Sequence, residues 1–314
     1  MSILVTGAAG GIGRALVPRL VGRGVDVTAA VRRIPHDLGW SGVRVVSGDL
    51  AEDDLAPMLD GISVVVHLAA RSSPWGKRSV FERDNVVATT RLLAAAGHAG
   101  VRRFVFASSP AIFAARRHRL DLRADSPPAD RPINDYAWSK LLAERTVQGE
   151  SRMSTLVIRP SAVIGDGDRA ILPRLLRVMQ TGWLPLGNGG SAMFHPTDMR
   201  DAAEAFECAA MGDARGIINV AGREPVRVAV MARTLAARLN LKLMMPNVPE
   251  ALLNGASVTS EWLGRLRGSE PAVTRYSAST LSWSRTFSLT DAELKLGWQP
   301  RFGPAEMLDR IVPC

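Results

Sequence analysis

The chain has 314 residues, of which 46% are hydrophobic and 22% charged, which is the range of ordinary globular proteins. Its two cysteines, Cys208 and Cys314, exclude a disulfide framework and fit a reducing compartment. Neither a signal peptide nor a run of about 18 apolar residues is present, so we expect a cytoplasmic protein with no membrane partner.

The net charge of +9 raises the question of nucleic-acid binding. Lysine occurs only at positions 77, 140, 242 and 295, so nearly all of the positive charge is arginine spread along the chain. The sequence lacks a basic run with interleaved aromatic residues, the usual footprint of a nucleic-acid interface. We therefore expect no nucleic-acid partner. A basic surface can equally attract acidic small molecules such as dinucleotides.

Short apolar β runs alternate with helical segments in the first half of the chain. The strand pattern occurs at residues 3–5, 25–31, 43–46, 63–67, 104–106 and 156–158, with helices over about 11–23 and 80–96. Continuous apolar runs are typical of strands buried on both faces, as in parallel sheets covered by helices. We therefore predict an α/β fold with a Rossmann-type doubly wound parallel sheet over residues 1–160.

The alternation breaks after about residue 159. Glycine and proline are dense from 165 to 190, helices are expected near 170–180 and 198–211, and a strand near 216–220. The stretch from about 223 to 284 is mostly helical. We predict that residues 161–314 form a smaller, mostly helical substrate lobe, with about 193–222 interleaved into the core.

A glycine-rich turn joins the first strand to the first helix. Its glycines are Gly7, Gly10 and Gly13, and Gly11 and Ile12 lie between the last two. A pyrophosphate at a helix N-terminus needs close backbone N–H groups, hence residues without a Cβ. A glycine triplet alone is a weak signal, but its place at the first β–α junction predicts a dinucleotide site.

The end of the second strand selects between the two nicotinamide dinucleotides. An acidic residue there would bind both ribose hydroxyls of NAD, whereas arginine accommodates a 2′-phosphate. Arg32 and Arg33 stand at this position, and a guanidinium offers paired donors to a phosphate. The alternative is two solvated arginines on a loop. We predict NADP as the cofactor in preference to NAD.

Two further strand ends are expected to contact the cofactor. Asp49, followed by Leu50, ends the third strand, where its carboxylate can accept a hydrogen bond from the adenine amino group. A strand-terminating aspartate without a ligand is equally consistent with this spacing. Leu68, Ala69 and Ala70 end the fourth strand, where small residues let a cofactor lie against the backbone. His67 before them is expected to be a satisfied core histidine.

Tyr136 and Lys140 lie four residues apart and share one face of a predicted helix. With two tyrosines and four lysines, chance would give this spacing roughly 0.03 times. A nearby ammonium favours the phenolate and should lower the pKa of Tyr136, which then exchanges a proton with a carbinol as hydride moves. Asn134 and Asp135 are expected to cap the helix, and Glu144 to lie at the surface or pair with an arginine.

A third polar group is expected to bind the substrate oxygen. Ser108 and Ser109 follow the fifth strand, at the carboxyl edge where open α/β sheets bind ligands. We choose Ser109 for this role, although two serines ending a strand are often turn residues. A serine hydrolase is disfavoured because no Gly-x-Ser-x-Gly elbow is present. No metal site is expected.

Taken together, these motifs resemble the extended short-chain dehydrogenase/reductase family, the NAD(P)-dependent epimerase/dehydratase superfamily, over nearly the whole chain. The resemblance includes residues 85–93, Pro160 after the sixth strand, 194–198, 219–222 and 296–300. It implies that Ser109, Tyr136 and Lys140 are catalytic. It also implies that the glycine loop, Pro160 and the Tyr136–Lys140 pair bind cofactor, and that a homodimer forms through helices around 80–96 and 136–148.

The branch within the family is less sharply defined. Residues 31–32 and the stretches 272–276 and 285–287 are similar to the 3β-hydroxysteroid dehydrogenase and dihydroflavonol reductase-like branch. Nucleotide-sugar enzymes often carry an arginine where Ser191 stands here. We predict an NADP(H)-dependent oxidoreductase acting on a ketone or secondary alcohol. A nucleotide-sugar epimerase, dehydratase or 4-ketoreductase with bound NAD is the alternative, and a non-catalytic dinucleotide-binding regulator is disfavoured by the intact Ser–Tyr–Lys set.

Overall fold

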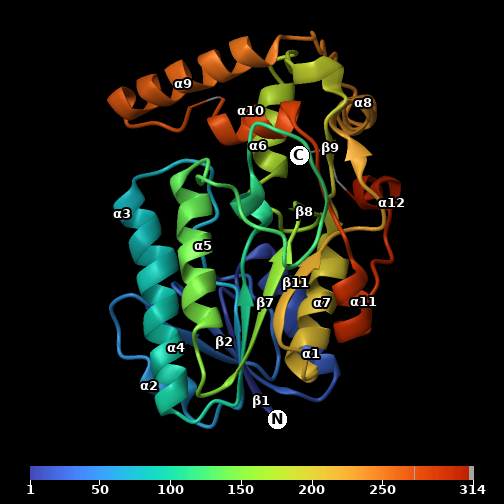
Figure 1. Ribbon diagram of the computed structural model, residues 1–314. Helices are drawn as coiled ribbons and strands as arrows, with labels where there is room; N and C mark the ends of the chain where they lie inside the picture. Colours follow the sequence, from blue (N-terminus) through green and yellow to red (C-terminus); the bar gives the residue numbers. More distant parts are fainter. Residues whose placement is uncertain (272, 311–314) are drawn as a thin grey trace.

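The computed structural model describes residues 1–271 and 273–310. Seven strands form one sheet in the order β11-β7-β5-β4-β1-β2-β3, and every neighbouring pair is parallel (Figure 1). These strands are β1 (Ser2–Thr6), β2 (Asp26–Val31), β3 (Arg44–Ser47), β4 (Val64–His67), β5 (Arg103–Ala107), β7 (Ser154–Pro160) and β11 (Gly216–Val220). The predicted α/β fold with a doubly wound parallel sheet is confirmed.

Helices cover both faces of this sheet (Figure 1). They are α1 (Gly11–Gly22) and α7 (Met199–Met211) on one side, and α2 (Ala56–Leu59), α3 (Arg78–Phe81), the π-helical turn η1 (Glu82–Val87), α4 (Ala88–His98) and α5 (Asp135–Gln148) on the other. Along β1, Ile3 and Val5 pack with the α1/α7 layer, whereas Leu4 packs with the α4/α5 layer. Each strand therefore needs apolar residues on both faces, which explains the continuous apolar runs.

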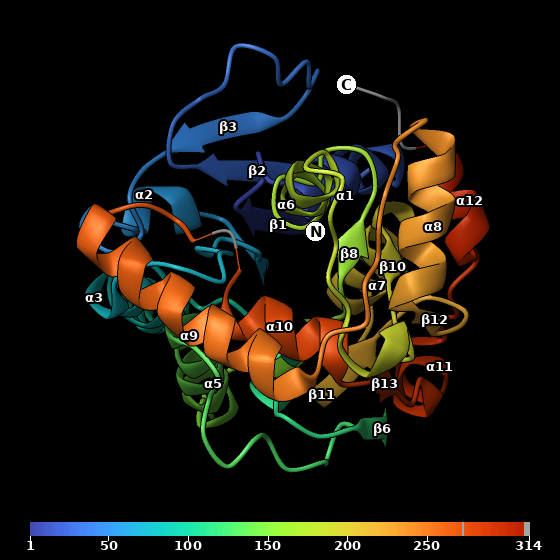
Figure 2. The ribbon, with the colours of Figure 1, turned by 90° about the horizontal axis from the view of Figure 1, so that it is seen from above.

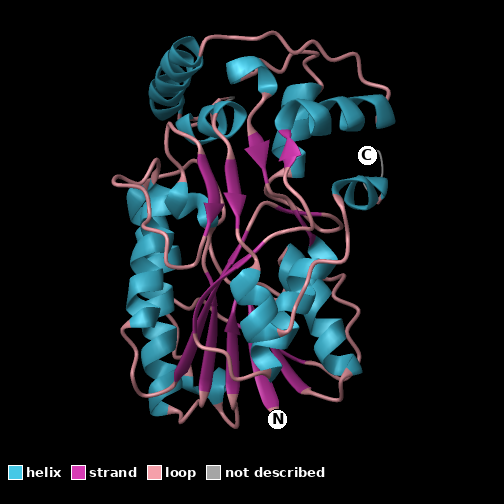
Figure 3. Ribbon diagram, turned by 45° about the vertical axis from the view of Figure 1, so that its right-hand side comes forward, coloured by secondary structure: helices cyan, strands magenta, loops and turns pink. Residues whose placement is uncertain are grey.

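A second group of elements lies beyond the carboxyl ends of the strands (Figure 3). Its helices are α6 (Leu172–Met179), α8 (Val228–Arg238), α9 (Glu250–Arg267) and α10 (Arg275–Ser282), with the short turns η2 (Pro110–Phe113) and η3 (Gly187–Gly190). Three two-stranded pairs connect it: β8 (Val163–Ile164) with β10 (Thr197–Asp198), β9 (Met193–Phe194) with β12 (Val226–Arg227), and β6 (Arg119–Leu122) with β13 (Arg285–Phe287). The last elements of the described part of the chain are α11 (Thr290–Leu296) and α12 (Pro304–Asp309).

The expected helix over residues 80–96 is divided by the π-helical turn η1. This turn widens the helix by one residue and turns Asp84 and Asn85 inward, where they are 6% and 1% exposed. Such turns are frequent near functional sites. Nothing in the residue pattern of this segment distinguishes a π turn from an α turn.

The strand order reverses between β1 and β4, which are direct neighbours. At this point the connections leave towards opposite faces, and the carboxyl edge opens a crevice in which doubly wound sheets bind ligands. Within the described part of the chain, none of the helices has the length and apolarity needed to cross a membrane.

Candidate active site

The glycine loop lies at this reversal point. Gly7 has φ of +66°, and a Cβ added to it would lie 2.6 Å from the backbone nitrogen of Ala69. The loops after β1 and β4 therefore touch at a place where only glycine fits. A Cβ on Gly13 would lie 2.5 Å from the carbonyl oxygen of Ala8, so this glycine lets α1 approach the turn.

The N-terminus of α1 is open to a ligand. The N-cap residue, Gly10, has no side chain that could occupy the N–H groups of the first turn. That turn also contains no acidic residue. A Cβ on Gly10 would meet only the Gly7 carbonyl oxygen, at 3.2 Å. The helix N-terminus and its free N–H groups favour an anion. These residues fit the pyrophosphate of a dinucleotide.

The other residues of this loop pack below the turn. A Cβ on Gly11 would lie 2.6 Å from the Met199 side chain and 3.0 Å from the Gly167 carbonyl oxygen, so Gly11 holds the loop after β8 against the turn. Ile12 packs partly buried on the core cluster under α1. Gly11 and Ile12 thus pack beneath the glycine-rich turn and hold it in place.

The two arginines at the end of β2 differ in their surroundings. Arg32 is exposed and lies 3.6 Å from the Asp49 carboxylate and 3.4 Å from that of Asp84. Arg33 is exposed and makes no ion pair with any residue that the structure describes. Arg83 also pairs with Asp49, at 2.8 Å. Arg32 is therefore held beside two carboxylates, which the sequence did not indicate.

The residues that follow β3 and β4 form the sides of the crevice. Leu50 packs partly buried on the core cluster under α4. The backbone N–H of Leu68 donates to the Thr6 carbonyl, and that of Ala69 donates to the Thr6 hydroxyl, at 3.2 and 3.3 Å. Ala70 is exposed, and Pro160 ends β7 half-buried.

His67 is a core histidine, as predicted. Its Nδ1 lies 2.7 Å from the Thr6 hydroxyl and its Nε2 3.0 Å from that of Thr89. Burial, aided by the charge of Lys140, lowers the pKa of His67 to about 3. The ring is neutral at physiological pH, and both nitrogens have partners.

Ser109 and Tyr136 meet at the carboxyl edge of the sheet. Ser109 is 9% exposed and caps η2, its hydroxyl accepting from the Ala111 N–H at 3.2 Å. Tyr136 stands in the first turn of α5, which Asn134 caps through the Ala137 N–H. Burial raises the pKa of Tyr136, and the nearby hydroxyls of Ser109 and Ser72 oppose the rise.

Lys140 is 2% exposed, one turn beyond Tyr136. Its Nζ donates to the Ala107 carbonyl at 2.5 Å and lies 4.3 Å from the centre of the Phe106 ring. Burial lowers the pKa of Lys140 to about 7. The expectation that this ammonium lowers the pKa of Tyr136 is wrong for this structure, because burial dominates and Lys140 binds a carbonyl instead.

Glu144, one further turn along α5, is buried rather than at the surface. Its carboxylate accepts two hydrogen bonds from Arg159 of β7, at 2.5 and 3.0 Å, and one from the Ser108 hydroxyl at 2.5 Å. Both charged side chains are at most 4% exposed. This pair fixes α5 against β7 and occupies Ser108, which leaves Ser109 as the serine facing Tyr136.

Residues outside the predicted set also meet here. Asn85 of η1 donates to the Ser139 hydroxyl at 2.9 Å and accepts from the Arg71 N–H at 2.7 Å, so it ties α5 to the loop after β4. Ser72 of that loop and Tyr276 of α10 both lie close enough to Tyr136 to influence its pKa. Little in the sequence indicated either residue. Ser72 is a polar residue shortly after a predicted strand, and Tyr276 is the second of the chain's two tyrosines.

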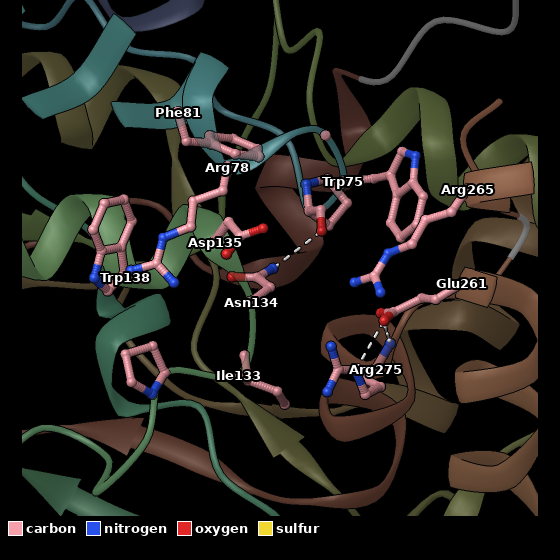
Figure 4. Close-up of a pocket in the computed structure, with 13 residues that line it drawn as sticks. Trp75, Arg78, Phe81, Ile133, Asn134, Asp135, Trp138, Glu261, Arg265 and Arg275 are labelled. Carbon is pink, nitrogen blue, oxygen red and sulfur yellow. Dashed lines mark hydrogen bonds and ion pairs between the residues drawn. The ribbon is translucent and has the colours of Figure 1, made fainter. Parts of the chain in front are cut away.

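A cavity of about 200 Å³ lies between α3, the first turn of α5 and α9 (Figure 4), and one of its wall residues, Phe81, has its ring centre 6.2 Å from that of Tyr136. Its walls combine indole, phenyl and alkyl groups with arginines: Trp75, Phe81, Ile133 and Trp138, with Arg78, Arg265 and Arg275. Ile133 and Asn134 precede Tyr136 in the chain, and Arg275 precedes Tyr276. Arg275 binds Glu261, at 2.8 Å. The cavity therefore offers apolar walls with both cationic and acidic groups, the latter Asp135 and Glu261.

The fold and this crevice define a dinucleotide-dependent enzyme with a serine, a tyrosine and a lysine at the carboxyl edge of its sheet. The chain belongs to the NAD dependent epimerase/dehydratase family, whose model matches residues 3–221. No cluster of three or more His, Cys, Asp or Glu side chains suited to a metal ion occurs among residues 1–271 and 273–310.

Characterised relatives include ketone reductases and dehydrogenases. The chain is 31% identical to 2-alkyl-3-oxoalkanoate reductase of Stenotrophomonas maltophilia, over 99% of this chain and 98% of that one. It is 28% identical to 3-beta-hydroxysteroid dehydrogenase of Mycolicibacterium neoaurum, over 99% and 90%. Among solved structures, MoeE5 in complex with UDP-glucuronic acid and NAD is similar with a TM-score of 0.76 and 28% identity, covering 99% and 97%.

Proposed function

We propose that this protein is an NADP(H)-dependent ketone reductase whose proton donor is Tyr136. The observation that carries the proposal is the meeting of the Tyr136 phenol with Ser109 at the carboxyl edge of the sheet, one turn before Lys140. A phenol whose pKa burial raises is protonated at neutral pH. It is therefore suited to give a proton to a carbonyl oxygen that is being reduced.

Each residue has a separate task in this proposal. The bound nicotinamide supplies or accepts the hydride. Ser109 hydrogen-bonds the substrate oxygen, and Tyr136 delivers the proton to that same oxygen. Lys140 binds the nicotinamide ribose. The glycine loop, with Gly7, Gly10 and Gly13, holds the pyrophosphate.

We expect the substrate to be a ketone that bears an alkyl chain and a second oxygen function β to the carbonyl. The cavity that adjoins Tyr136 through Phe81 supports this, because its indole and phenyl walls suit an alkyl group and Arg78 and Arg265, which have no ion-pair partner among the described residues, suit a carboxylate. The name of the Stenotrophomonas relative, a 2-alkyl-3-oxoalkanoate reductase, describes a compound of this chemistry.

Replacement of Tyr136 by phenylalanine tests the mechanism. Without the phenol, we expect the reduction rate to fall at least about a thousandfold, the contribution typical of a positioned acid. Cofactor affinity and unfolding temperature should stay near the wild-type values. Steady-state oxidation of NADPH with a panel of 3-oxo acids and 2-alkyl-3-oxo acids measures the rate. Full turnover by Tyr136→Phe would overturn the assignment.

The preference for NADP(H) is proposed on Arg32. Its guanidinium lies at the end of β2 within 3.6 Å of Asp49, next to the expected position of the adenosine ribose. Arg32→Gln should lower kcat/KM for NADPH about 10- to 100-fold and leave that for NADH unchanged. Arg123→Gln, also at an exposed arginine, is the control and should change neither. Equal use of the two cofactors by the wild type would contradict the preference.

A nucleotide-sugar epimerase or 4-ketoreductase with bound NAD is the second candidate. The similarity to MoeE5 with UDP-glucuronic acid and NAD favours it. Against it, Ser191 stands where such enzymes often carry an arginine. Purification with tightly bound NAD and no net change of added cofactor would establish this candidate and exclude the reductase.

The remaining proposals concern organisation. We propose that residues 1–160 bind the cofactor and that 161–314 form the substrate lobe, with 193–222 returning to the core. The protein is proposed to be a cytoplasmic homodimer joined through α4 and α5. The return of 193–222 to the core is supported by β11, which adds to the main sheet beside β7. The dimer interface is supported by two exposed apolar side chains of this helical layer, Val87 and Leu142.

A further inference from the structure

Helix α9 carries its apolar side towards solvent. It lies on the outer surface beyond the carboxyl end of the sheet (Figures 1 and 2). Four of its large apolar side chains are exposed: Leu252 by 64%, Val258 by 49%, Trp262 by 58% and Leu266 by 67%. We call these four residues the outer face of α9. A surface helix of a globular protein normally turns its apolar stripe to the core.

The buried side of the same helix is the more polar one. Its buried residues are Leu253, Ser257, Glu261 and Gly264, of which only Leu253 is a large apolar residue. At about 100° per residue, the outer face spans an arc of about 120°, opposite the buried residues. The other residues on that arc, Ala251, Gly255 and Thr259, are uncharged. The polarity of α9 is thus inverted along its whole length.

The chain segment that leads into α9 continues this apolar character. Met244 is 62% exposed and forms a β-bridge with Trp183, which is 53% exposed. A second bridge, between Leu186 and Asn247, brings the two segments to within a few residues of the start of α9. Two exposed tryptophans in this region are typical of surfaces that contact a membrane interface or a protein partner.

Charge distinguishes between these two kinds of contact. Both acids of α9 are neutralised within the protein, Glu250 by Arg116 and Glu261 by Arg275. Lys242, Arg265 and Arg267 have no ion-pair partner among the described residues. An apolar helix face accompanied by unpaired cations is complementary to a bilayer with anionic head groups.

We propose that the outer face of α9 docks the protein on the surface of an anionic lipid bilayer. The side chains of Trp262, Leu252 and Leu266 enter the boundary of head groups and acyl chains, and Lys242 and Arg267 contact lipid phosphates. The sequence predicted no membrane partner because it lacks a spanning segment. Surface docking needs none, since the helix lies in the plane of the interface.

Docking would also bring the cavity next to the lipid. Glu261 and Arg265 line that cavity and belong to α9, so the helix separates the cavity from the proposed bilayer contact. This consequence rests on the proposed function, because it places the cavity proposed for an alkyl ketone one helix away from the membrane. The docking itself does not depend on the reaction.

Co-sedimentation with vesicles tests the proposal. Wild-type protein should bind vesicles of phosphatidylglycerol and phosphatidylethanolamine, without cofactor or substrate. The variant W262S/L266S should lower the partition coefficient at least about tenfold, because two side chains leave the interface. The matched control L120S/L294S replaces two leucines that are 61% and 78% exposed elsewhere, and it should bind as the wild type does.

Charge is tested separately. Because each basic side chain near an anionic surface contributes about a fivefold factor, K242Q/R267Q should weaken binding roughly thirtyfold on phosphatidylglycerol vesicles. The same variant should bind vesicles of phosphatidylcholine alone as the wild type does. Turnover of a short, water-soluble 3-oxo acid shows that each variant is folded. If the wild type does not turn over this acid, the proposed reductase function is contradicted, whereas the proposed docking is not.

Two results would overturn the proposal. The first is equal vesicle binding by W262S/L266S and L120S/L294S. The second is no vesicle binding by the wild type. If W262S/L266S then also has a lower molecular mass than the wild type in light scattering, the outer face of α9 joins copies of this chain or another protein.

Discussion

Lys140 is buried without an ion pair to any described residue, and that placement has an energetic consequence. Burial lowers its pKa from 10.5 to about 7. Between pH 7 and 10.5 the unfolded chain therefore holds a proton that the folded protein releases, so stability rises with pH over this window. Below about pH 7 both states are protonated, and the full cost of burying the ammonium remains.

We predict that Lys140→Met makes the cofactor-free protein more stable at pH 7, by roughly 1–3 kcal/mol, while abolishing turnover. The difference should shrink as the pH rises towards 10.5. Urea unfolding at several pH values measures it, and Lys77→Met, at an exposed lysine, is the control. A variant less stable than the wild type at pH 7 would show that the Ala107 hydrogen bond outweighs the burial of charge.

The same residue illustrates what the sequence could and could not provide. The four-residue spacing of Tyr136 and Lys140 indicated a shared helix face, and both side chains do lie near the end of β5. The direction of the Tyr136 pKa shift was predicted wrongly, because it depends on how deeply the phenol is buried. Spacing along a helix contains no information on that depth.

At the scale of elements, the contact between the loops after β1 and β4 is the most constrained feature. Gly7 combines a left-handed backbone with a neighbour 2.6 Å from any added Cβ, namely the nitrogen of Ala69. Gly24 has a similar φ, +72°, but open space around it. A side chain at Gly24 would therefore cause backbone strain alone, whereas a side chain at Gly7 would cause backbone strain and a steric clash.

We predict that Gly24→Ala destabilises the protein by about 1 kcal/mol and leaves cofactor binding unchanged. Gly7→Ala should destabilise it by about 3 kcal/mol or more and weaken dinucleotide binding, because the two loops must separate. Unfolding in urea and fluorescence titration with NADPH measure the two effects. Equal effects of both substitutions would show that the loops can part at little cost.

Elements differ in how well the sequence predicts them. The core strands were predictable to within two residues, because burial on both faces requires unbroken apolar runs such as residues 63–67. The pair of β6 with β13 was not, since it joins residues more than 160 positions apart through only a few hydrogen bonds. The π turn η1, which turns Asn85 towards α5, also has no sequence pattern of its own.

At the scale of the whole molecule, the helical layer of α4 and α5 is the proposed dimer interface. Val87 and Leu142 are 40% and 36% exposed in this layer. We predict that V87E/L142E shifts the protein from dimer to single chains of 33.8 kDa, since burying two unpaired carboxylates should raise the dissociation constant about a hundredfold or more. Light scattering after size exclusion measures the mass. Leu294→Glu, on α11, is the control and should leave the dimer intact.

The buried pair of Glu144 and Arg159 has a consequence for how this chain can change over evolutionary time. Loss of either partner alone leaves a buried charge, at about 3–5 kcal/mol, which is a large part of the 5–15 kcal/mol that keeps a typical domain folded. A joint replacement by two apolar residues avoids that intermediate cost. Positions 144 and 159 should therefore co-vary, so that descendants of this chain either keep both residues or replace both.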